Sequence, residues 1–309
     1  MRARHLFPLV VLVAVAACSS TSTAGPASTT TTISHVSTTA AVAAETSSLE
    51  LGPPGRPAEL VAPAKVTGLA PLVVLLHGYG STAEHHDHYL GVTEQAATRG
   101  LFVLLPDGTH EVSGKQFWDA TTACCNFTGT PVDDVGYLRG LIDEAIAKRP
   151  IDPKRVYVFG HSNGGFMAYR LACDIADRVT AIAVLSGSDL PRADQCKPDR
   201  PVSVLHLHGT ADPLVTYAGG RFTDTFPGAL EVMSRWAARD GCDPQPTPGP
   251  TLDLDSRLPG AETRVTTYAG CDTGIDVQLD TIEGGVHSPD LIHAAVGTDV
   301  LDWLLAHTR

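Results

Sequence analysis

The sequence predicts an α/β fold: a doubly wound, mostly parallel sheet with helices on both of its faces. The first observation behind this prediction is that six short runs are continuously apolar, as in parallel strands that are buried on both sides. The second is that helical stretches separate these runs, which is the order expected of a doubly wound sheet. The expected strands span residues 72–76, 101–105, 156–159, 179–185, 202–207 and 277–282.

The expected helices lie between these strands and after the last one. Asp133 and Asp134 open the second helix, where the helix dipole favours negative charge. The segment 241–262 is rich in proline, glycine and aspartate, and we expect a surface loop or an insertion there. The expected helices span residues 82–98, 133–147, 163–176, 228–239 and 291–306.

Residues 1–17 are expected to be a signal peptide. The basic residues of Met1–Arg4 precede an apolar run, Leu6–Ala17, that is too short to span a bilayer. Small residues then precede Cys18, as in the bacterial lipobox, in which the cysteine is lipidated. An ordinary secretory signal that is cleaved nearby is the alternative. The lipobox predicts an exported bacterial lipoprotein that contacts the membrane through a lipid on Cys18. Its expected location is the outer face of the cell membrane or the extracellular space.

Residues 18–48 are expected to form a flexible tether that begins with the lipidated cysteine, and residues 49–309 a folded domain. The tether is mostly serine, threonine and alanine, so it cannot bury enough surface to offset its ordering entropy. The whole chain is 43% hydrophobic, as in globular proteins. Its 34 acidic and 22 basic residues give a net charge of −12, which argues against a nucleic-acid partner.

The clearest functional signal is Gly-His-Ser-Asn-Gly at residues 160–164, which follows an expected strand and opens an expected helix. Gly-x-Ser-x-Gly in that position is the pattern of a nucleophile elbow. The serine at the apex of so sharp a turn is strained, and side chains two residues away on either side would clash, which explains Gly160 and Gly164. The helix that follows directs its amides at the serine and favours a developing negative charge. We therefore predict that Ser162 is a nucleophile.

A serine nucleophile needs a base and an acid that orients the base, and in this fold they follow in the order Asp or Glu, then His. Asp212 follows the fifth expected strand and His287 follows the sixth. Both lie past the carboxyl end of a strand, where open α/β sheets place functional groups. The alternatives are a turn-forming aspartate ahead of Pro213 and a structural loop histidine. His208 competes for the role of base, but it precedes Asp212 and is therefore in the wrong order.

The oxyanion of a tetrahedral intermediate needs two hydrogen-bond donors. The backbone N–H of Asn163, the residue after the nucleophile, is expected to be one of them. The loop after the first strand supplies the other, and we assign the N–H of Tyr79, with that of Gly78 as the alternative. His77 is expected to support this loop rather than to perform acid–base chemistry.

Neither a metal nor a cofactor is expected. The histidines in Glu84–His88 resemble a metal cluster, but they lie early in an expected helix where a solvated face explains them, and no partner site is visible. Without Cys18 there are six cysteines, and none of them forms a CxxC pair, which argues against structural zinc. An even count in an exported chain suggests disulfides, with 15 arrangements to choose from.

Several segments together carry a resemblance to a known family. They are PLVVLLHGYG, LLPDG, Trp118 followed by Cys124 and Cys125, VDDVGYLRGLID, VYVFGHSNGGFMAYRLAC, VLHLHGTADPLVTYAGG and GGVH. The chain resembles the α/β-hydrolase group of secreted poly(3-hydroxybutyrate) depolymerases and related feruloyl and acetylxylan esterases, in its lipoprotein branch. The matching pieces lie within residues 71–287. The resemblance implies an α/β-hydrolase fold and a catalytic triad of Ser162, Asp212 and His287.

The resemblance also suggests how the cysteines pair. It implies one disulfide between Cys173 and Cys196 and another between Cys242 and Cys271. Cys124 and Cys125 would remain as neighbours, either joined in a vicinal disulfide or present as two thiols.

One departure from the family concerns the substrate. Family members usually carry Gly-Gly-Gly-His followed closely by a tryptophan that is expected to shape the groove for the acyl group or the polymer. Here Val286 precedes His287 and no tryptophan follows closely. Trp118 and His161 are the predicted substrate-binding residues, with Tyr79 as a further aromatic candidate, and core packing is the alternative for Trp118.

These expectations describe residues 49–309 as the catalytic domain of a membrane-anchored serine esterase that works through an acyl-serine. The expected substrate is a carboxylic ester of the kind that polyhydroxybutyrate depolymerases cleave. A feruloyl or acetylxylan esterase acting on plant polysaccharide is the first alternative. A non-catalytic surface lipoprotein that binds a ligand is the second, although a binding protein has no reason to keep the three triad residues.

Overall fold

The computed structural model of the chain describes residues 47–309. The predicted signal peptide, the lipidation at Cys18 and nearly all of the predicted tether lie outside these residues. Among the helices of residues 47–309, none has both the length and the apolar character that crossing a membrane requires.

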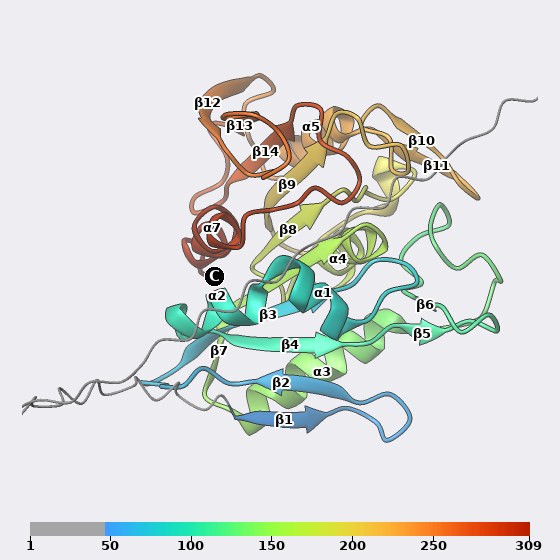
Figure 1. The fold of residues 1–309 in the computed structure, drawn as a ribbon, viewed down its shortest axis with the longest axis vertical. Coiled ribbons are helices and arrows are strands. Elements are labelled where there is room, and N and C mark those ends of the chain that lie inside the picture. Colours follow the sequence, from blue (N-terminus) through green and yellow to red (C-terminus); the bar gives the residue numbers. More distant parts are fainter. Residues whose placement is uncertain (1–46) are drawn as a thin grey trace, which may run out of the picture. The chain divides into compact units, whose positions relative to one another are not determined.

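The centre of the fold is a parallel sheet whose strands are the six that the sequence predicts (Figure 1). They continue into antiparallel strands at both edges, so that the whole sheet has ten strands. The fold class is therefore confirmed. In spatial order the parallel strands are β4 (Phe102–Pro106), β3 (Ala70–Leu76), β7 (Ile151–His161), β8 (Ala181–Leu185), β9 (Ser203–Gly209) and β14 (Val277–Ile282).

Antiparallel strands extend both edges of the sheet. β1 (Ser48–Leu51) and β2 (Ala58–Val61) extend the edge beside β4, while β13 (Thr263–Tyr268) and β12 (Pro246–Leu252) extend the edge beside β14. β12 corrects the prediction of a loop or insertion at residues 241–262. The strand is exposed along almost its whole length and contains prolines, which an outermost strand tolerates because one side needs no ladder hydrogen bonds.

The helices follow the predicted order with two differences. The single helix expected at 82–98 is divided into α1 (Ala83–Leu90) and α2 (Val92–Arg99) by Gly91, whose φ of +63° is left-handed. The last helix has three short parts: α6 (His293–Ala295), the π-helical turn η2 (Val296–Leu301) and α7 (Asp302–Leu305). The remaining helices are α3 (Asp134–Lys148), α4 (Asn163–Asp174) and α5 (Ala229–Arg239).

The parallel strands are continuously apolar because each contributes side chains to two separate cores. In β3, Leu72, Val74 and Leu76 enter the core beneath α3, α4 and α5. Val73 and Leu75 enter the core on the other face, beneath α1, α2 and the C-terminal helices. Because these strands run parallel, the carboxyl ends of β3, β7, β9 and β14 lie at one edge of the sheet.

Three disulfides lie in the described residues. Those between Cys173 and Cys196 and between Cys242 and Cys271 confirm the pairs that the resemblance implied. Cys124 and Cys125, for which the sequence left two states open, form a vicinal disulfide.

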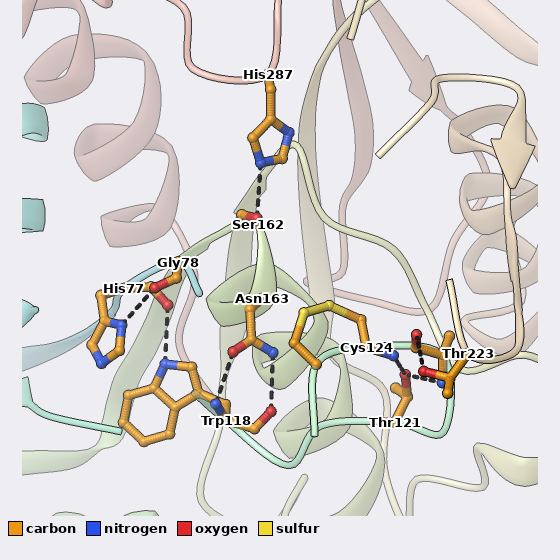
Figure 2. Close-up of a disulfide and its surroundings, with 11 residues drawn as sticks. His77, Gly78, Trp118, Thr121, Cys124, Ser162, Asn163, Thr223 and His287 are labelled. Atoms are coloured by element: carbon orange, nitrogen blue, oxygen red, sulfur yellow. Dashed lines mark hydrogen bonds between the residues drawn. A yellow bond between two sulfur atoms is a disulfide. The ribbon is translucent and has the colours of Figure 1, made fainter. Parts of the chain in front are cut away.

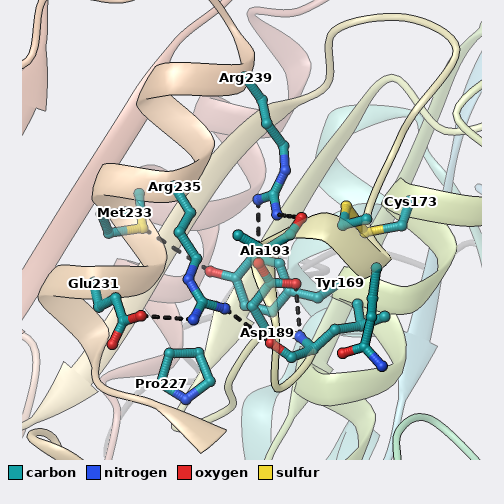
Figure 3. A network of polar contacts seen from close by, with 12 residues as sticks. Tyr169, Cys173, Asp189, Ala193, Pro227, Glu231, Met233, Arg235 and Arg239 are labelled. Atoms are coloured by element: carbon teal, nitrogen blue, oxygen red, sulfur yellow. Dashed lines mark hydrogen bonds and ion pairs between the residues drawn. A yellow bond between two sulfur atoms is a disulfide. The ribbon is translucent and has the colours of Figure 1, made fainter.

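A buried ion pair holds the segment after β8 against α5 (Figure 3), and the Cys173–Cys196 disulfide holds the same segment against α4. Asp189 has no exposed surface and accepts from Nη1 of Arg239 at 3.1 Å and from the Leu190 N–H at 2.8 Å. Arg235 donates to the Leu190 carbonyl at 2.9 Å. The segment 189–196 is therefore a fixed part of the scaffold.

Candidate active site

Ser162 lies at the turn between β7 and α4 in a strained backbone conformation. Its φ of +56° and ψ of −120° are uncommon for a residue with a side chain. The turn is tight enough that a Cβ atom on Gly160 would meet the carbonyl of Gly164, and one on Gly164 would meet the carbonyl of Leu76. The glycines are therefore required by the close approach of backbones, as the motif predicts.

The three residues predicted as a triad lie in one hydrogen-bonded row. The Ser162 hydroxyl donates to Nε2 of His287 at 2.8 Å, and Nδ1–H of His287 donates to Oδ2 of Asp212 at 2.8 Å (Figure 2 shows the Ser162 contact). The serine comes from the end of β7, the aspartate from the loop after β9, and the histidine from the loop after β14. This geometry allows the imidazole to remove the hydroxyl proton while the carboxylate stabilises the resulting charge.

The Asp212 carboxylate is buried and its oxygens are well supplied with donors. Oδ1 accepts the N–H groups of Leu214 at 2.8 Å and Val215 at 3.0 Å, and Oδ2 faces the rings of His287 and, at 3.4 Å, His208. Burial alone would raise the pKa of Asp212. The N–H groups of His208 and His287 outweigh it and hold this pKa well below the usual value. The carboxylate is therefore ionised at neutral pH.

Two further histidines support the backbone of His287. His161, predicted to bind substrate, uses Nε2–H to donate to the His287 carbonyl at 2.9 Å, while its Nδ1 accepts from Nε2–H of His86 at 2.9 Å. Ser81 completes the row by donating to Nδ1 of His86 at 3.2 Å. Burial and the charge of His287 lower the pKa of His161 to about 3, so it stays neutral. Although His161 borders the pocket, both of its ring nitrogens are occupied by protein groups.

The predicted oxyanion donors are available. Within residues 47–309 the backbone N–H groups of Tyr79 and Asn163 have no protein acceptor. The Gly78 carbonyl accepts from Nδ1–H of His77 at 2.8 Å (Figure 2), and because a trans peptide directs its C=O and N–H in opposite directions, this bond turns the Tyr79 N–H to the other side. His77 has this tautomer because its Nε2 accepts from the Gly108 N–H at 2.8 Å.

Trp118 corrects the prediction of a substrate-binding residue. Its side chain is completely buried and does not line the pocket, because it packs below the loop that carries Tyr79. The indole N–H donates to the His77 carbonyl at 3.0 Å, and the Asn163 amide is hydrogen-bonded to both backbone groups of Trp118 (Figure 2). Core packing, the alternative considered for this tryptophan, therefore describes it, and the ring supports the loop of the oxyanion site.

A pocket of about 480 Å³ opens over Ser162 and His287. Aromatic and apolar groups form most of its wall, among them three side chains that are unusually exposed for their type: Phe127 at 47%, Leu214 at 57% and Phe222 at 37%. Exposed apolar side chains that gather at one place mark a binding surface. The rest of the wall includes Tyr79, Tyr89 and the vicinal disulfide Cys124–Cys125.

Sequence reasoning did not find Phe127, Leu214 and Phe222. The only available signal was proximity in the chain, since Phe127 follows Cys125 and Leu214 follows Asp212 by two residues each. Phe222 had no such signal. It lies between the short strands β10 (Gly219–Arg221) and β11 (Thr225–Pro227), and it reaches the pocket because Thr223 donates its N–H and its hydroxyl to the Ala123 carbonyl.

Other groups in residues 47–309 do not form a second centre of this kind. A larger hollow of about 630 Å³, beside β1, β2 and α1, contains none of the triad residues. The only three potential metal ligands that converge in this part of the chain are Cys173, Asp189 and Cys196, whose sulfurs form a disulfide and whose carboxylate pairs with Arg239. Of the histidines in 84–88, His86 faces His161 and the other two are exposed.

Comparisons with known proteins agree with this architecture. Feruloyl esterase B of Piromyces equi is 33% identical over 232 residues, which are 71% of this chain and 40% of that protein. A bifunctional acetylxylan esterase/xylanase of Neocallimastix patriciarum is 27% identical over 236 residues, which are 76% of this chain and 31% of that protein. The chain thus spans less than half the length of either relative.

An acetyl xylan esterase from Aspergillus awamori has a similar structure, with a TM-score of 0.60 and 18% identity over 84% of this chain and 99% of that one. At this identity the likeness concerns the fold alone. The sequence model described as "Alpha/beta hydrolase family" matches residues 73–301, which is most of the chain. The chain belongs to the alpha/beta hydrolase family.

Proposed function

We propose that this protein is a serine carboxylic ester hydrolase. The observation that carries the proposal is the row from Ser162 through His287 to Asp212, with 2.8 Å at both contacts, beside two backbone N–H groups that have no protein acceptor in the described chain. The chemistry of such a row is acyl transfer. The names of the relatives, feruloyl esterase and acetylxylan esterase, support the same reaction class.

The proposed reaction has two halves. Nε2 of His287 removes the Ser162 proton as Oγ attacks the ester carbonyl, and the Tyr79 and Asn163 N–H groups bind the oxyanion. The tetrahedral intermediate collapses as His287 protonates the departing alcohol, which leaves an acyl-serine. Water, deprotonated by the same imidazole, then releases the acid and restores the serine. Asp212 holds the ring in the required tautomer throughout.

We propose esters of bulky aromatic acids, such as hydroxycinnamates on polysaccharide, as the substrate class. The wall of Tyr79, Phe127, Phe222 and the vicinal disulfide offers more apolar surface than an acetyl group could cover. The names of the relatives, feruloyl esterase and acetylxylan esterase, favour esters on polysaccharide over the polyester expected from the sequence. Polyhydroxybutyrate remains the second candidate, because the exposed rings of Phe127 and Phe222 would also suit a hydrophobic polymer surface.

We further propose that the chain is exported and held to the membrane by a lipid on Cys18. The sequence around this cysteine supports the proposal, as do the three disulfides of the domain, which are typical of proteins outside the cytosol. Replacing Cys18 by alanine should move the protein from the membrane fraction to the soluble fraction. Unchanged partitioning would contradict the anchor.

The function is tested with a panel of esters and a matched inactive variant. Methyl ferulate, acetylated xylan, polyhydroxybutyrate and p-nitrophenyl acetate are each incubated with the wild type and with Ser162→Ala. We expect the wild type to hydrolyse the small esters and to prefer the feruloyl ester, with a loss of about 10⁴-fold or more in the variant. Equal rates for both proteins on every ester would indicate a non-catalytic binding lipoprotein instead. Hydrolysis of polyhydroxybutyrate alone would indicate a depolymerase.

A further inference from the structure

A buried row of three ring side chains leads to Asp212, and none of the three lines the pocket. The Tyr169 hydroxyl on α4 lies 2.7 Å from Nδ1 of His206, and Nε2 of His206 lies 3.0 Å from Nδ1 of His208. Nε2 of His208 then lies 2.7 Å from the Val215 carbonyl and 3.4 Å from Oδ2 of Asp212. All three side chains are buried, and none of them belongs to the proposed triad.

The acceptor at the end of the row determines where the protons are. The Val215 carbonyl can only accept, so Nε2 of His208 carries a proton. In the neutral row Nδ1 of His208 accepts from Nε2–H of His206, and Nδ1 of His206 accepts from the Tyr169 hydroxyl. Burial raises the pKa of Tyr169 well above its ordinary value and lowers that of His206 well below its own, so both stay neutral. Every donor therefore points toward Asp212.

His208 also closes the loop that holds the carboxylate. The Val215 N–H donates to Oδ1 of Asp212 at 3.0 Å, and the carbonyl of the same Val215 accepts from His208. The ring thus acts on Asp212 twice, by its own approach to Oδ2 and through the residue that binds Oδ1. This contact explains why a histidine that stands in the wrong order for a base is nevertheless buried beside the triad.

We propose that His208 is a positioning residue of the triad, which fixes the Asp212 carboxylate toward His287 and shares its Oδ2. Tyr169 and His206 hold the His208 tautomer that this role requires. The inference rests on the proposed ester hydrolysis, and it adds a fourth side chain to the geometry of that site.

The role has a measurable consequence for proton affinity. A donor beside Oδ2 withdraws negative charge that would otherwise stabilise the protonated His287 ring. Removing the donor should therefore strengthen the attraction between Asp212 and the protonated ring, and the acidic limb of the kcat/KM profile should move to higher pH. The carboxylate would also lose a constraint on its orientation, which should lower kcat more than it changes KM. Titratable groups that face these rings are His206, Asp212 and Tyr217 for His208, and Asp212 and His161 for His287.

Two amide substitutions separate this role from simple packing. The nitrogen of glutamine in His208→Gln reaches the position of Nε2, whereas that of asparagine in His208→Asn reaches only the position of Nδ1. We expect the asparagine variant to lose about tenfold in kcat and to shift the acidic limb upward by about half a unit to one unit, and the glutamine variant to retain most of both. Tyr217→Phe is the matched control, because the ring centroid of Tyr217 lies 5.6 Å from that of His208 and its hydroxyl does not donate to that ring. This variant should leave the acidic limb of the kcat/KM profile unchanged.

NMR titration of the His287 ring gives a second readout that needs no substrate. The same upward shift in the asparagine variant, and its absence in the glutamine variant and in Tyr217→Phe, would support the role of His208. Equal pH profiles in the wild type and both amide variants would overturn it while leaving the esterase intact. A wild type that hydrolyses no ester would instead defeat the proposed function, and the NMR shift would still report on the contact itself.

Discussion

The two sides of the active site are built on opposite principles. Behind the triad, polar groups are buried and paired: Asp212, His206 and His208 each have defined partners at hydrogen-bond distance. In front of it, most of the pocket wall consists of aromatic and apolar groups, and Phe127, Leu214 and Phe222 remain partly exposed. Burying a polar group without a partner costs folding free energy. This paired side of the site, the rear wall, therefore tolerates little change. The exposed apolar side chains of the front wall have no such constraint, and they are free to vary with the substrate.

The largest expected effect comes from breaking the rear wall at its centre with Asp212→Asn. The amide keeps the shape of the carboxylate but removes its charge, and it no longer favours the tautomer with a proton on Nδ1 of His287. We expect kcat to fall by about 10³–10⁴-fold on every ester, with little change in KM. Steady-state kinetics on methyl ferulate and methyl acetate test this. A loss confined to one of these esters would contradict an electrostatic role.

A smaller and selective effect is expected from the front wall. Phe222 stacks on Phe226 with ring centroids 5.1 Å apart and lines the pocket. Phe222→Ala should raise KM for methyl ferulate by about three- to tenfold and leave methyl acetate unchanged, because only the aromatic acyl group reaches this wall. Leu230→Ala, at an exposed position on α5 outside the pocket, is the matched control. An equal change on both esters would show that the two walls are not separable.

The smallest expected effect concerns stability and compares two buried carboxyls. Asp280 on β14 is as buried as Asp212, but it has only the Gln278 amide at 2.8 Å, and burial raises its pKa to about 7. Its folded pKa exceeds the unfolded value of about 3.9, so its stabilising contribution is complete below pH 4 and is lost as pH rises to 7. Asp280→Asn should therefore stabilise the protein at pH 8 by about 1–3 kcal/mol and reduce the slope of stability between pH 5 and 7.

Urea unfolding at several pH values measures this effect. Asp194→Asn, at a side chain that is 69% exposed, serves as the control and should change nothing. Asp240 also has a pKa raised to about 7 by burial, so part of the slope should remain in the Asp280 variant. A variant with the full wild-type slope would mean that Asp280 is already ionised in the folded protein.

The sequence was sufficient for the parts of the molecule that depend on local patterns. The six parallel strands are visible because two-sided burial leaves continuous apolar runs, and Ser162 is visible because its strained turn needs glycines at fixed positions. The edge strands were harder to predict, since β12 is exposed and rich in proline. The break at Gly91 was also missed, because the helical pattern continues on both sides of it.

The substrate wall could not be predicted for a different reason. Phe127 and Phe222 are almost a hundred residues apart, and their loops meet only through contacts such as that between Thr223 and Ala123. Trp118 was wrongly predicted to bind substrate because it lies near the motif residues in the sequence. Its contacts with Asn163 and His77 place the ring in the protein core. Composition near a motif does not tell which side of a loop a ring will occupy.

The contact between Thr223 and Ala123 has a consequence for anyone who wishes to redesign specificity. Because Thr122 also donates to Asp224 at 3.0 Å, the strip that carries the vicinal disulfide and the β10–β11 hairpin are fastened at more than one point. Exchanging only one of these two segments with that of a related enzyme would leave polar groups without partners where the segments meet. Exchanging residues 119–131 and 216–228 together would keep these hydrogen bonds and would transfer this part of the pocket wall as a unit.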